Sequence, residues 1–167
     1  SGASSRMFGT FLSWLSAKTC PIFIVPTMNR IEVLPPELTR KGRFDEIFFV
    51  DLPTRKERVA IANSLLEHKF KQVMRISVSD NSFLKATEGF SGAEIESAIE
   101  TALYRLLVNG TGISSNDVAW LHDRLLNVMT GMVPQAKTDP EYIEKSRKVA
   151  NGFRKANDPE DADHIPT

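Results

Sequence analysis

The fold is decided by residues 34–53, which read LPPELTRKGRFDEIFFVDLP. Two prolines enter a short segment of helical character at residues 34–38, and Gly42 interrupts it. An apolar run follows at residues 47–50 and is ended by Asp-Leu-Pro at residues 51–53. Uninterrupted apolar runs of this length are typical of strands that are buried on both faces of a parallel sheet. The stretch therefore predicts a short helix followed by a buried strand.

A second strand and a longer helix are predicted upstream of this stretch. The run Ile-Phe-Ile-Val at residues 22–25 lies between Pro21 and Pro26 and has the same buried character. Residues 6–17 predict a helix with one apolar face, which consists of Met7, Phe11, Trp14 and Leu15. Because strand, short helix and strand follow one another, residues 1–52 predict a fragment of an α/β layer.

After Pro53 the pattern becomes helical. Two capping boxes predict helix starts at Thr54 and Ser91, because each of these residues has a Glu three positions later. Helices are predicted at residues 54–69, 79–87, 91–108 and 115–129 and from residue 139 onward. Their inward-facing residues are predicted to be Val59, Ala62, Leu65, Leu66, Phe83, Leu84, Ile95, Ala98, Ile99, Ala102, Leu103, Leu106, Leu107, Val118, Leu121, Leu125, Val128, Tyr142, Ile143, Ala150 and Phe153. The sequence thus predicts an all-helical module at residues 53–133, a helical extension at 134–156 and a flexible tail at 157–167, with a chain that is mostly helical overall.

The composition excludes several classes of protein. The 21 basic and 21 acidic residues give a net charge of zero, whereas a dedicated nucleic-acid binder normally carries a basic excess. The longest apolar runs have four residues, so we expect no membrane span. The single cysteine, Cys20, forms no internal disulfide and indicates a cytosolic chain, and no signal peptide is expected. The three histidines are scattered, so no metal site is predicted.

Two places in the first 52 residues are suited to phosphate chemistry. Asn29 follows the strand predicted at residues 22–25, where ligands usually sit in parallel α/β sheets, although a turn-forming Asn is the plainer interpretation. Arg40 and Arg43 flank Gly42, and planar guanidinium groups of this kind recognise phosphate and neutralise charge on a transferred phosphoryl group. The alternative for the arginines is a solvated basic loop.

These segments, taken in order, resemble a known family. Residues 27–30, 34–38, 40–45 and 50–53 resemble the second region of homology of AAA-type ATPases, and residues 89–95 are similar to the start of the family's lid helix. The resemblance extends from about Gly9 to Leu107. It is closest to the AAA proteins encoded in cyanobacteria and plastids, whose character is also seen in residues 8–15 and 34–53. The implied fold is the end of the P-loop NTPase sheet followed by an all-α AAA lid.

The resemblance implies a role for each candidate residue. Asn29 would be the sensor-one residue that orients the attacking water, and Arg40 and Arg43 would be arginine fingers that reach the nucleotide site of a neighbouring subunit. Gly92 and Ala93 would bring the start of the lid helix close to the nucleotide, although the plainer interpretation of this pair is an ordinary helix start. Ile61 would line the adenine side. The chain departs from the family at Pro26, where a small residue is usual, at Leu65, where many relatives have His, and at residues 89–95, which lack an arginine.

The phosphate-gripping motifs of the family are absent from the sequence. A P-loop needs Gly-x-x-x-x-Gly-Lys-Ser/Thr, and the Lys-Thr pairs at Lys18 and Lys137 lack the preceding glycine. Asp51 follows an apolar run as in a Walker B segment, but Leu52 stands in place of the catalytic Glu. We therefore expect the chain to begin after Walker B. ATP or ADP with Mg²⁺ would bind in the complete protein, and we expect no tight binding and no hydrolysis by this chain alone.

The resemblance implies that the complete protein couples ATP hydrolysis to the remodelling of a macromolecular partner. It would work as a ring, expected to be a hexamer, in the bacterial cytoplasm or the plastid stroma. Self-association of this chain is also expected, because a truncated sheet leaves an unpaired apolar strand edge. The alternative is a non-catalytic helical adaptor derived from an AAA lid. Nucleic-acid binding by the helical part is disfavoured, since residues 77–167 hold 14 acidic against 9 basic groups.

Overall fold

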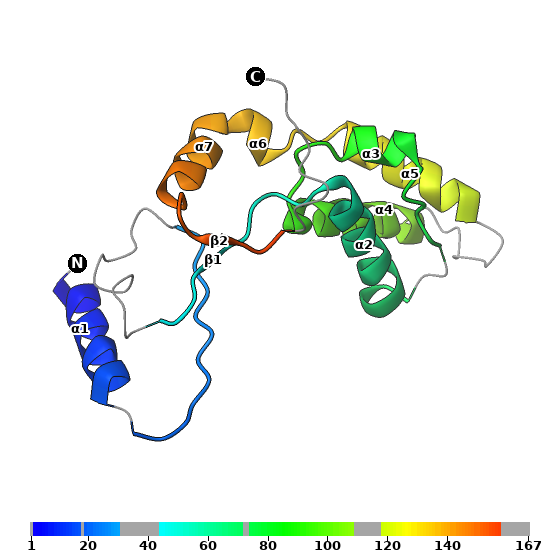
Figure 1. Cartoon of the computed structure of the whole chain (residues 1–167). Coiled ribbons are helices and arrows are strands. Elements are labelled where there is room, and N and C mark those ends of the chain that lie inside the picture. The colour runs from blue at the N-terminus through cyan, green and yellow to red at the C-terminus, as the bar shows by residue number, and fades with distance from the viewer. Residues whose placement is uncertain (1, 18, 31–43, 72–73, 109–117, 158–167) are drawn as a thin grey trace. The chain divides into compact units, whose positions relative to one another are not determined.

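The computed structural model describes residues 2–17, 19–30, 44–71, 74–108 and 118–157 (Figure 1). The elements are α1 (Gly2–Ala17), β1 (Phe48–Phe49), α2 (Arg55–Ser64), η2 (Leu65–Lys69), α3 (Asn81–Ala86), α4 (Gly92–Val108), α5 (Val118–Thr130), α6 (Gln135–Thr138), α7 (Pro140–Val149) and β2 (Arg154–Lys155). They belong to two compact units: unit 1 consists of Ser1–Phe49 and Glu144–Ala156, and unit 2 consists of Val50–Ile143 and Asn157–Thr167. The prediction of a mostly helical chain is confirmed.

Unit 1 contains a small parallel sheet made from two distant parts of the chain. Strand β1 pairs with β2 so that Phe48 lies opposite Arg154 and Phe49 lies opposite Lys155. The Arg154 N–H donates to the Ile47 carbonyl at 3.1 Å, and the Ala156 N–H donates to the Phe49 carbonyl at 3.0 Å. The strand predicted at residues 47–50 is thus confirmed at its two central residues. Its partner was not predicted, because residues 154 and 155 lie in the stretch predicted as a helical extension.

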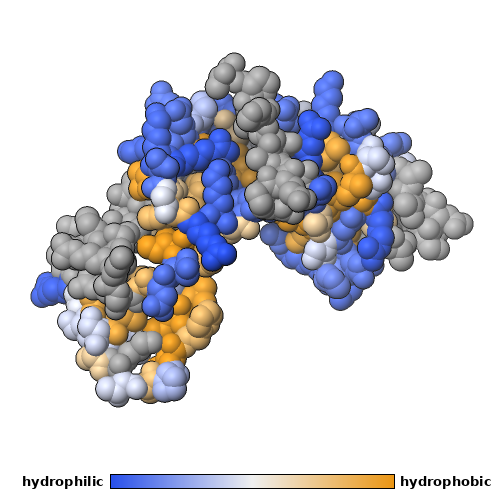
Figure 2. All heavy atoms as spheres, in the orientation of Figure 1, coloured by the Kyte–Doolittle hydropathy of each residue, from blue (hydrophilic) through white to orange (hydrophobic). Residues whose placement is uncertain are grey.

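Two predictions about strands are wrong. Residues 22–25 form no strand, and the Phe23 side chain is 94% exposed. The strand at residues 47–50 is not buried on both faces, since Phe48 is 53% exposed and Val50 is 74% exposed. An apolar run becomes a buried strand only when further strands and covering helices surround it, and the sheet of the described residues has two strands. Apolar side chains consequently gather on the surface of this unit (Figure 2).

Helix α1 forms as predicted, but its apolar face is only partly covered. Leu15 is buried, and the rings of Phe11 and Trp14 stack with their centroids 6.0 Å apart. Met7 remains 73% exposed. The short helix predicted at residues 34–38 lies outside the described residues. None of the helices in the described ranges is long and apolar enough to cross a membrane.

Unit 2 is a helical bundle that begins with the first predicted capping box. The Glu57 N–H donates to Thr54 Oγ1 at 3.3 Å, and the Thr54 N–H donates to Glu57 Oε2 at 2.8 Å, so both predicted bonds are present. Helix α2 then continues into η2, a wider π-helical turn that ends near the predicted residue 69. Asn157 binds near the start of α2. Its side chain accepts from the Asp51 N–H at 2.8 Å and donates to Glu57 Oε2 at 2.9 Å.

The core of unit 2 lies between α2, α3, α4 and α5, which pack side by side (Figure 1). Its buried residues are Val59, Ala62, Leu66, Met74, Ile76, Phe83, Phe90, Ile95, Ala98, Ile99, Ala102, Leu103, Leu106, Leu121, Leu125, Val128 and Met129. Helical spacing predicted most of these residues. The prediction for Leu107 is wrong, since this side chain is 65% exposed. Helix α6 was not predicted, whereas α7 starts after Asp139, whose carboxylate accepts from the Tyr142 N–H at 3.1 Å.

One charged side chain is buried among these helices. Arg58 on α2 is 3% exposed, and its Nε donates to the Thr87 hydroxyl at 3.1 Å. Its two terminal nitrogens donate to the carbonyls of Pro53 at 3.2 Å and Leu84 at 3.3 Å. The guanidinium therefore joins the start of α2 to the end of α3. The sequence contains a weak signal that Arg58 is buried. Arg58 precedes Ala62 by four residues, so both lie on the same, inward face of α2.

Candidate functional site

The start of α4 carries two of the candidate residues, Gly92 and Ala93, and the fold brings a third one beside them. A Cβ atom built on Gly92 would lie 3.8 Å from Cδ1 of Ile61, which is an ordinary van der Waals distance. Ile61 belongs to α2 and is half-buried, Gly92 is half-buried, and Ala93 is exposed. An apolar side chain thus lies next to the first turn of a long helix, where backbone N–H groups favour anions.

The second predicted capping box fixes this helix start. Glu94 Oε2 accepts from the Ser91 N–H at 2.7 Å and from the Ser91 hydroxyl at 2.8 Å, and the Glu94 N–H donates to Ser91 Oγ at 3.3 Å. The other carboxylate oxygen of Glu94 accepts from the Gln135 N–H at 2.7 Å. The capping residue therefore also ties α4 to α6. Sequence patterns identified the box but not its contact with Gln135, which depends on the tertiary fold.

The loop before α4 also has a fixed shape. Gly89 has a φ of +77°, a conformation that L side chains rarely adopt. A Cβ at this position would also lie 3.3 Å from the Ala136 Cβ. The positive φ therefore favours glycine here, and the contact with Ala136 would be tight for any larger residue.

The other candidate residues are Asn29, Arg40 and Arg43. Asn29 is exposed and belongs to unit 1, whereas Ile61 and Gly92 belong to unit 2. Arg40 and Arg43 lie outside the described residues. The structure thus places Ile61 beside Gly92. The roles of all six candidate residues stay predictions.

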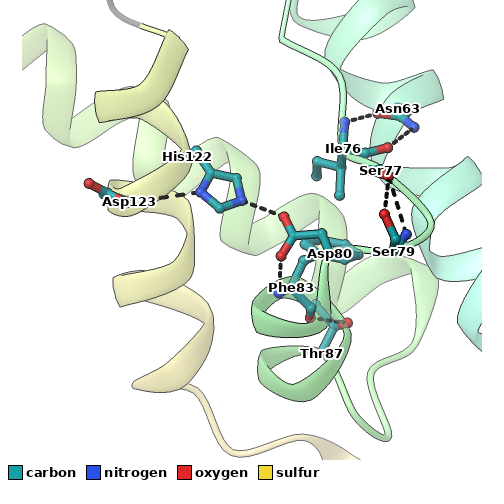
Figure 3. A network of polar contacts seen from close by, with 9 residues as sticks. All are labelled: Asn63, Ile76, Ser77, Ser79, Asp80, Phe83, Thr87, His122 and Asp123. Atoms are coloured by element: carbon teal, nitrogen blue, oxygen red, sulfur yellow. Dashed lines mark hydrogen bonds and ion pairs between the residues drawn. The ribbon is translucent and has the colours of Figure 1, made fainter.

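Asp80 and His122 form an acid–base pair in unit 2 (Figure 3). His122 Nε2 lies 2.6 Å from Asp80 Oδ2, and Asp80 Oδ1 accepts from the Phe83 N–H at 3.0 Å as the cap of α3. Partial burial acts to raise the pKa of Asp80, but the hydrogen bonds from Phe83 and His122 outweigh it, so this pKa is lowered. The bonds join α3 to α5, and we interpret the pair as structural rather than catalytic.

Replacing Asp80 by Asn is expected to make stability less dependent on acid. Because the folded-state pKa of Asp80 is lowered, its carboxylate stabilises the fold above the unfolded-state pKa, and this contribution is lost as the pH falls below about 4. The measurement is urea unfolding of the unmodified chain and of Asp80→Asn between pH 3 and pH 7. The difference between their unfolding free energies should shrink toward pH 3. Asp123→Asn is the control, since Asp123 is 78% exposed and lies 3.9 Å from the same histidine. A difference that stays constant with pH would contradict this assignment.

Two further features limit the chemistry of the described residues. Within the described ranges, no group of three or more His, Cys, Asp or Glu side chains could hold a metal ion. Asn63 is used structurally, because its side chain accepts from the Ile76 N–H at 2.7 Å and donates to the Ile76 carbonyl at 2.9 Å (Figure 3). The start of α4 with Ile61 is thus the arrangement best suited to a ligand among the predicted residues.

Known proteins contain closely similar sequences. The chain is 39% identical over 158 residues to the AAA domain-containing protein ycf46 of Pyropia yezoensis, an alignment that covers 94% of this chain and 30% of that protein. It is 42% identical over 146 residues to ycf46 of Guillardia theta, which covers 87% of this chain and 27% of that protein.

The chain belongs to the AAA family. The chain is also 31% identical over 129 residues to the ATP-dependent zinc metalloprotease FtsH of Aster yellows witches'-broom phytoplasma (strain AYWB). This alignment covers 77% of this chain and 18% of FtsH. This AAA chain spans less than a third of the length of these relatives. No protein-family model and no solved structure matches it.

Proposed function

We propose that this chain is the sensor and lid part of an AAA ATPase. In this proposal residues 1–52 are the end of the large α/β subdomain, residues 53–133 are the lid, residues 134–156 are a helical extension and residues 157–167 are a tail. Similarity to proteins named for an AAA domain and for ATP dependence supports it. The complete protein would bind ATP or ADP with Mg²⁺ and hydrolyse ATP.

The observation that carries the proposal is the contact between Ile61 and the start of α4. A helix N-terminus attracts phosphate or ribose oxygens, and small residues such as Gly92 and Ala93 leave room for close approach. Ile61 supplies an apolar surface beside it that suits a purine ring. The capping box and the bond from Gln135 to Glu94 hold this surface in place before any ligand arrives, so binding would require little ordering of the chain.

The roles of the other candidate residues complete the proposal. Asn29 would orient the attacking water with a neutral amide. Arg40 and Arg43 would enter the site of a neighbouring subunit and neutralise charge that develops on the transferred phosphoryl group. This division of labour requires a ring, which we propose to be a hexamer, in the bacterial cytoplasm or the plastid stroma. The ring would remodel a protein partner.

Gly92 allows a direct test of the lid site in a complete protein that contains this chain. Gly92→Ala should keep ADP affinity within about twofold, because the added Cβ fits 3.8 Å from Ile61. Gly92→Asp should weaken ADP binding at least tenfold, since it places a negative charge where the phosphates approach. Calorimetric titration of both variants measures this. Equal affinities of the Asp and Ala variants would show that the start of α4 does not face the nucleotide.

Catalysis is not expected from this chain alone. Its sequence contains no Gly-x-x-x-x-Gly-Lys-Ser/Thr segment, so backbone groups that cradle the phosphates and a hydroxyl that reaches Mg²⁺ are absent. We expect no phosphate release above background from Mg²⁺-ATP, and only weak ATP binding, in an assay of the purified chain. Mg²⁺-dependent hydrolysis that co-purifies with the chain and disappears in Arg43→Ala would contradict this expectation.

A second candidate function is a non-catalytic adaptor that kept the AAA lid surface. The two candidates differ in what a complete protein does. An ATPase would lose turnover when Arg40 or Arg43 is replaced, whereas an adaptor would bind its partner equally well with and without nucleotide.

A further inference from the structure

A cleft lies in unit 2 on the side of α3 and α5, and none of the candidate nucleotide residues lines it. Its volume is about 460 Å³, which is within the range of small-ligand sites. The lining residues are Ser82, Lys85, Ala86, Glu88, Phe90, Leu126, Met129, Thr130, Met132, Pro134 and Lys137. They come from α3, the loop before α4, the end of α5 and α6, and all of them are described.

The cleft combines an apolar interior with charged lining groups. Phe90 and Met129 are 1% and 0% exposed, and Met132 is packed against them as part of the same core. Methionine side chains are flexible and polarisable, so they adapt to apolar groups of different shape. The cleft therefore suits one bulky apolar side chain of a ligand.

Two cations line this cleft without a carboxylate partner. Lys85 and Lys137 form no ion pair within the part of the chain that the structure describes, although Glu88 lines the same cleft. Two lysines outside the cleft do have carboxylate partners, since Lys69 pairs with Glu96 and Lys148 pairs with Glu144. The lining thus has an excess of positive charge that a ligand carboxylate could neutralise.

One wall of the cleft is held in place by bonds to α4. The Gln135 N–H donates to Glu94, and Pro134 lies 3.7 Å from the Cβ position of Gly89. Because α6 is fixed in this way, the cleft exists before a ligand binds, and binding costs little conformational entropy.

We propose that this cleft binds a short acidic segment of a partner protein. One large apolar side chain of the segment enters the cleft over the partly buried Leu126 and Met132, and flanking carboxylates pair with Lys85 and Lys137. The hydroxyls of Ser82 and Thr130 offer further hydrogen bonds to its backbone. The inference does not depend on the proposed ATPase function, since no residue of the nucleotide site takes part.

The test is a titration of the full chain, labelled with ¹³C at its methionine methyl groups, with the peptide acetyl-Glu-Asp-Phe-Glu-Asp-amide. The five methionines include Met7 and Met28 in unit 1, which serve as internal controls. We expect the methyl resonances of Met129 and Met132 to shift and those of Met7 and Met28 to stay. Acetyl-Gln-Asn-Phe-Gln-Asn-amide should bind at least tenfold more weakly, because it lacks the charges.

Variants of the lysines separate charge recognition from non-specific binding. The double variant Lys85→Glu/Lys137→Glu should weaken binding of the acidic peptide at least tenfold, whereas Lys145→Glu/Lys155→Glu, a matched reversal of two exposed lysines outside the cleft, should not change it. Equal binding of the acidic and neutral peptides, or an unchanged affinity in the first double variant, would overturn the proposal. Binding that appears only after residues 158–167 are deleted would identify this acidic end of the chain as the occupant and would also overturn it.

Discussion

Replacing Arg58 by Met is expected to lower the free energy of unfolding by about 2–4 kcal/mol. The guanidinium is 3% exposed and donates to the Thr87 hydroxyl and to the carbonyls of Pro53 and Leu84. Methionine fills much of the volume but donates no hydrogen bond, so buried acceptors lose their partner. Because these acceptors belong to the start of α2 and to α3, the loss weakens the contact between the two helices.

The measurement is urea unfolding followed by circular dichroism, with Arg105→Met as the matched control. Arg105 is an exposed residue of α4, so the same substitution there should change the unfolding free energy by less than about 0.5 kcal/mol. A variant of Arg58 that is as stable as this control would show that the buried guanidinium contributes nothing to the packing of α2 against α3.

Replacing Arg43 or Arg40 by Ala in a complete protein should lower kcat for ATP by a factor on the order of 10³ or more. If both side chains act on the site of a neighbouring subunit, they stabilise charge that exists mainly in the transition state. Affinity for ADP should therefore stay within about twofold, because the ground state loses little.

Lys41→Ala is the matched control, since Lys41 lies between the two arginines and carries the same charge. It should reduce kcat by less than about tenfold if the planar guanidinium, and not general positive charge, is what the reaction needs. Equal losses of kcat in the lysine and arginine variants would favour the alternative interpretation, in which the two arginines belong to a solvated basic loop. Normal turnover in either arginine variant would exclude that arginine as a finger.

Local interactions made the helical part of the fold predictable. The capping boxes at Thr54 and Ser91 involve residues three positions apart, so the sequence shows both partners, and both boxes form. Helical spacing likewise identified most of the buried face of α4. Leu107 fits the same spacing but is exposed, because spacing shows which residues share a face and not how wide the covered part of that face is.

The strands were less predictable because their burial depends on distant parts of the chain. Residues 22–25 have the composition of a central strand, yet Phe23 is almost fully exposed. The partner of β1 is Arg154–Lys155, two charged residues whose side chains carry no strand signal. A sheet pairing between residues about a hundred positions apart cannot be read from either segment alone.

For the candidate site, the sequence identified residues but not their arrangement. Ile61, Gly92 and Ala93 came from a family resemblance, and their proximity depends on how α2 packs against α4. The bond from Gln135 to Glu94 and the buried Arg58 have no motif, since each joins groups that only the folded chain brings together.

We propose that this chain carries the groups of an AAA ATPase that act on a neighbouring subunit. The most direct test mixes two inactive variants of a complete protein: Arg40→Ala/Arg43→Ala, and a variant that lacks the P-loop lysine. Mixed rings should regain Mg²⁺-ATPase activity, because intact P-loops of the first variant receive arginines from the second. Mixtures that assemble into rings but stay inactive at every ratio would contradict the claim.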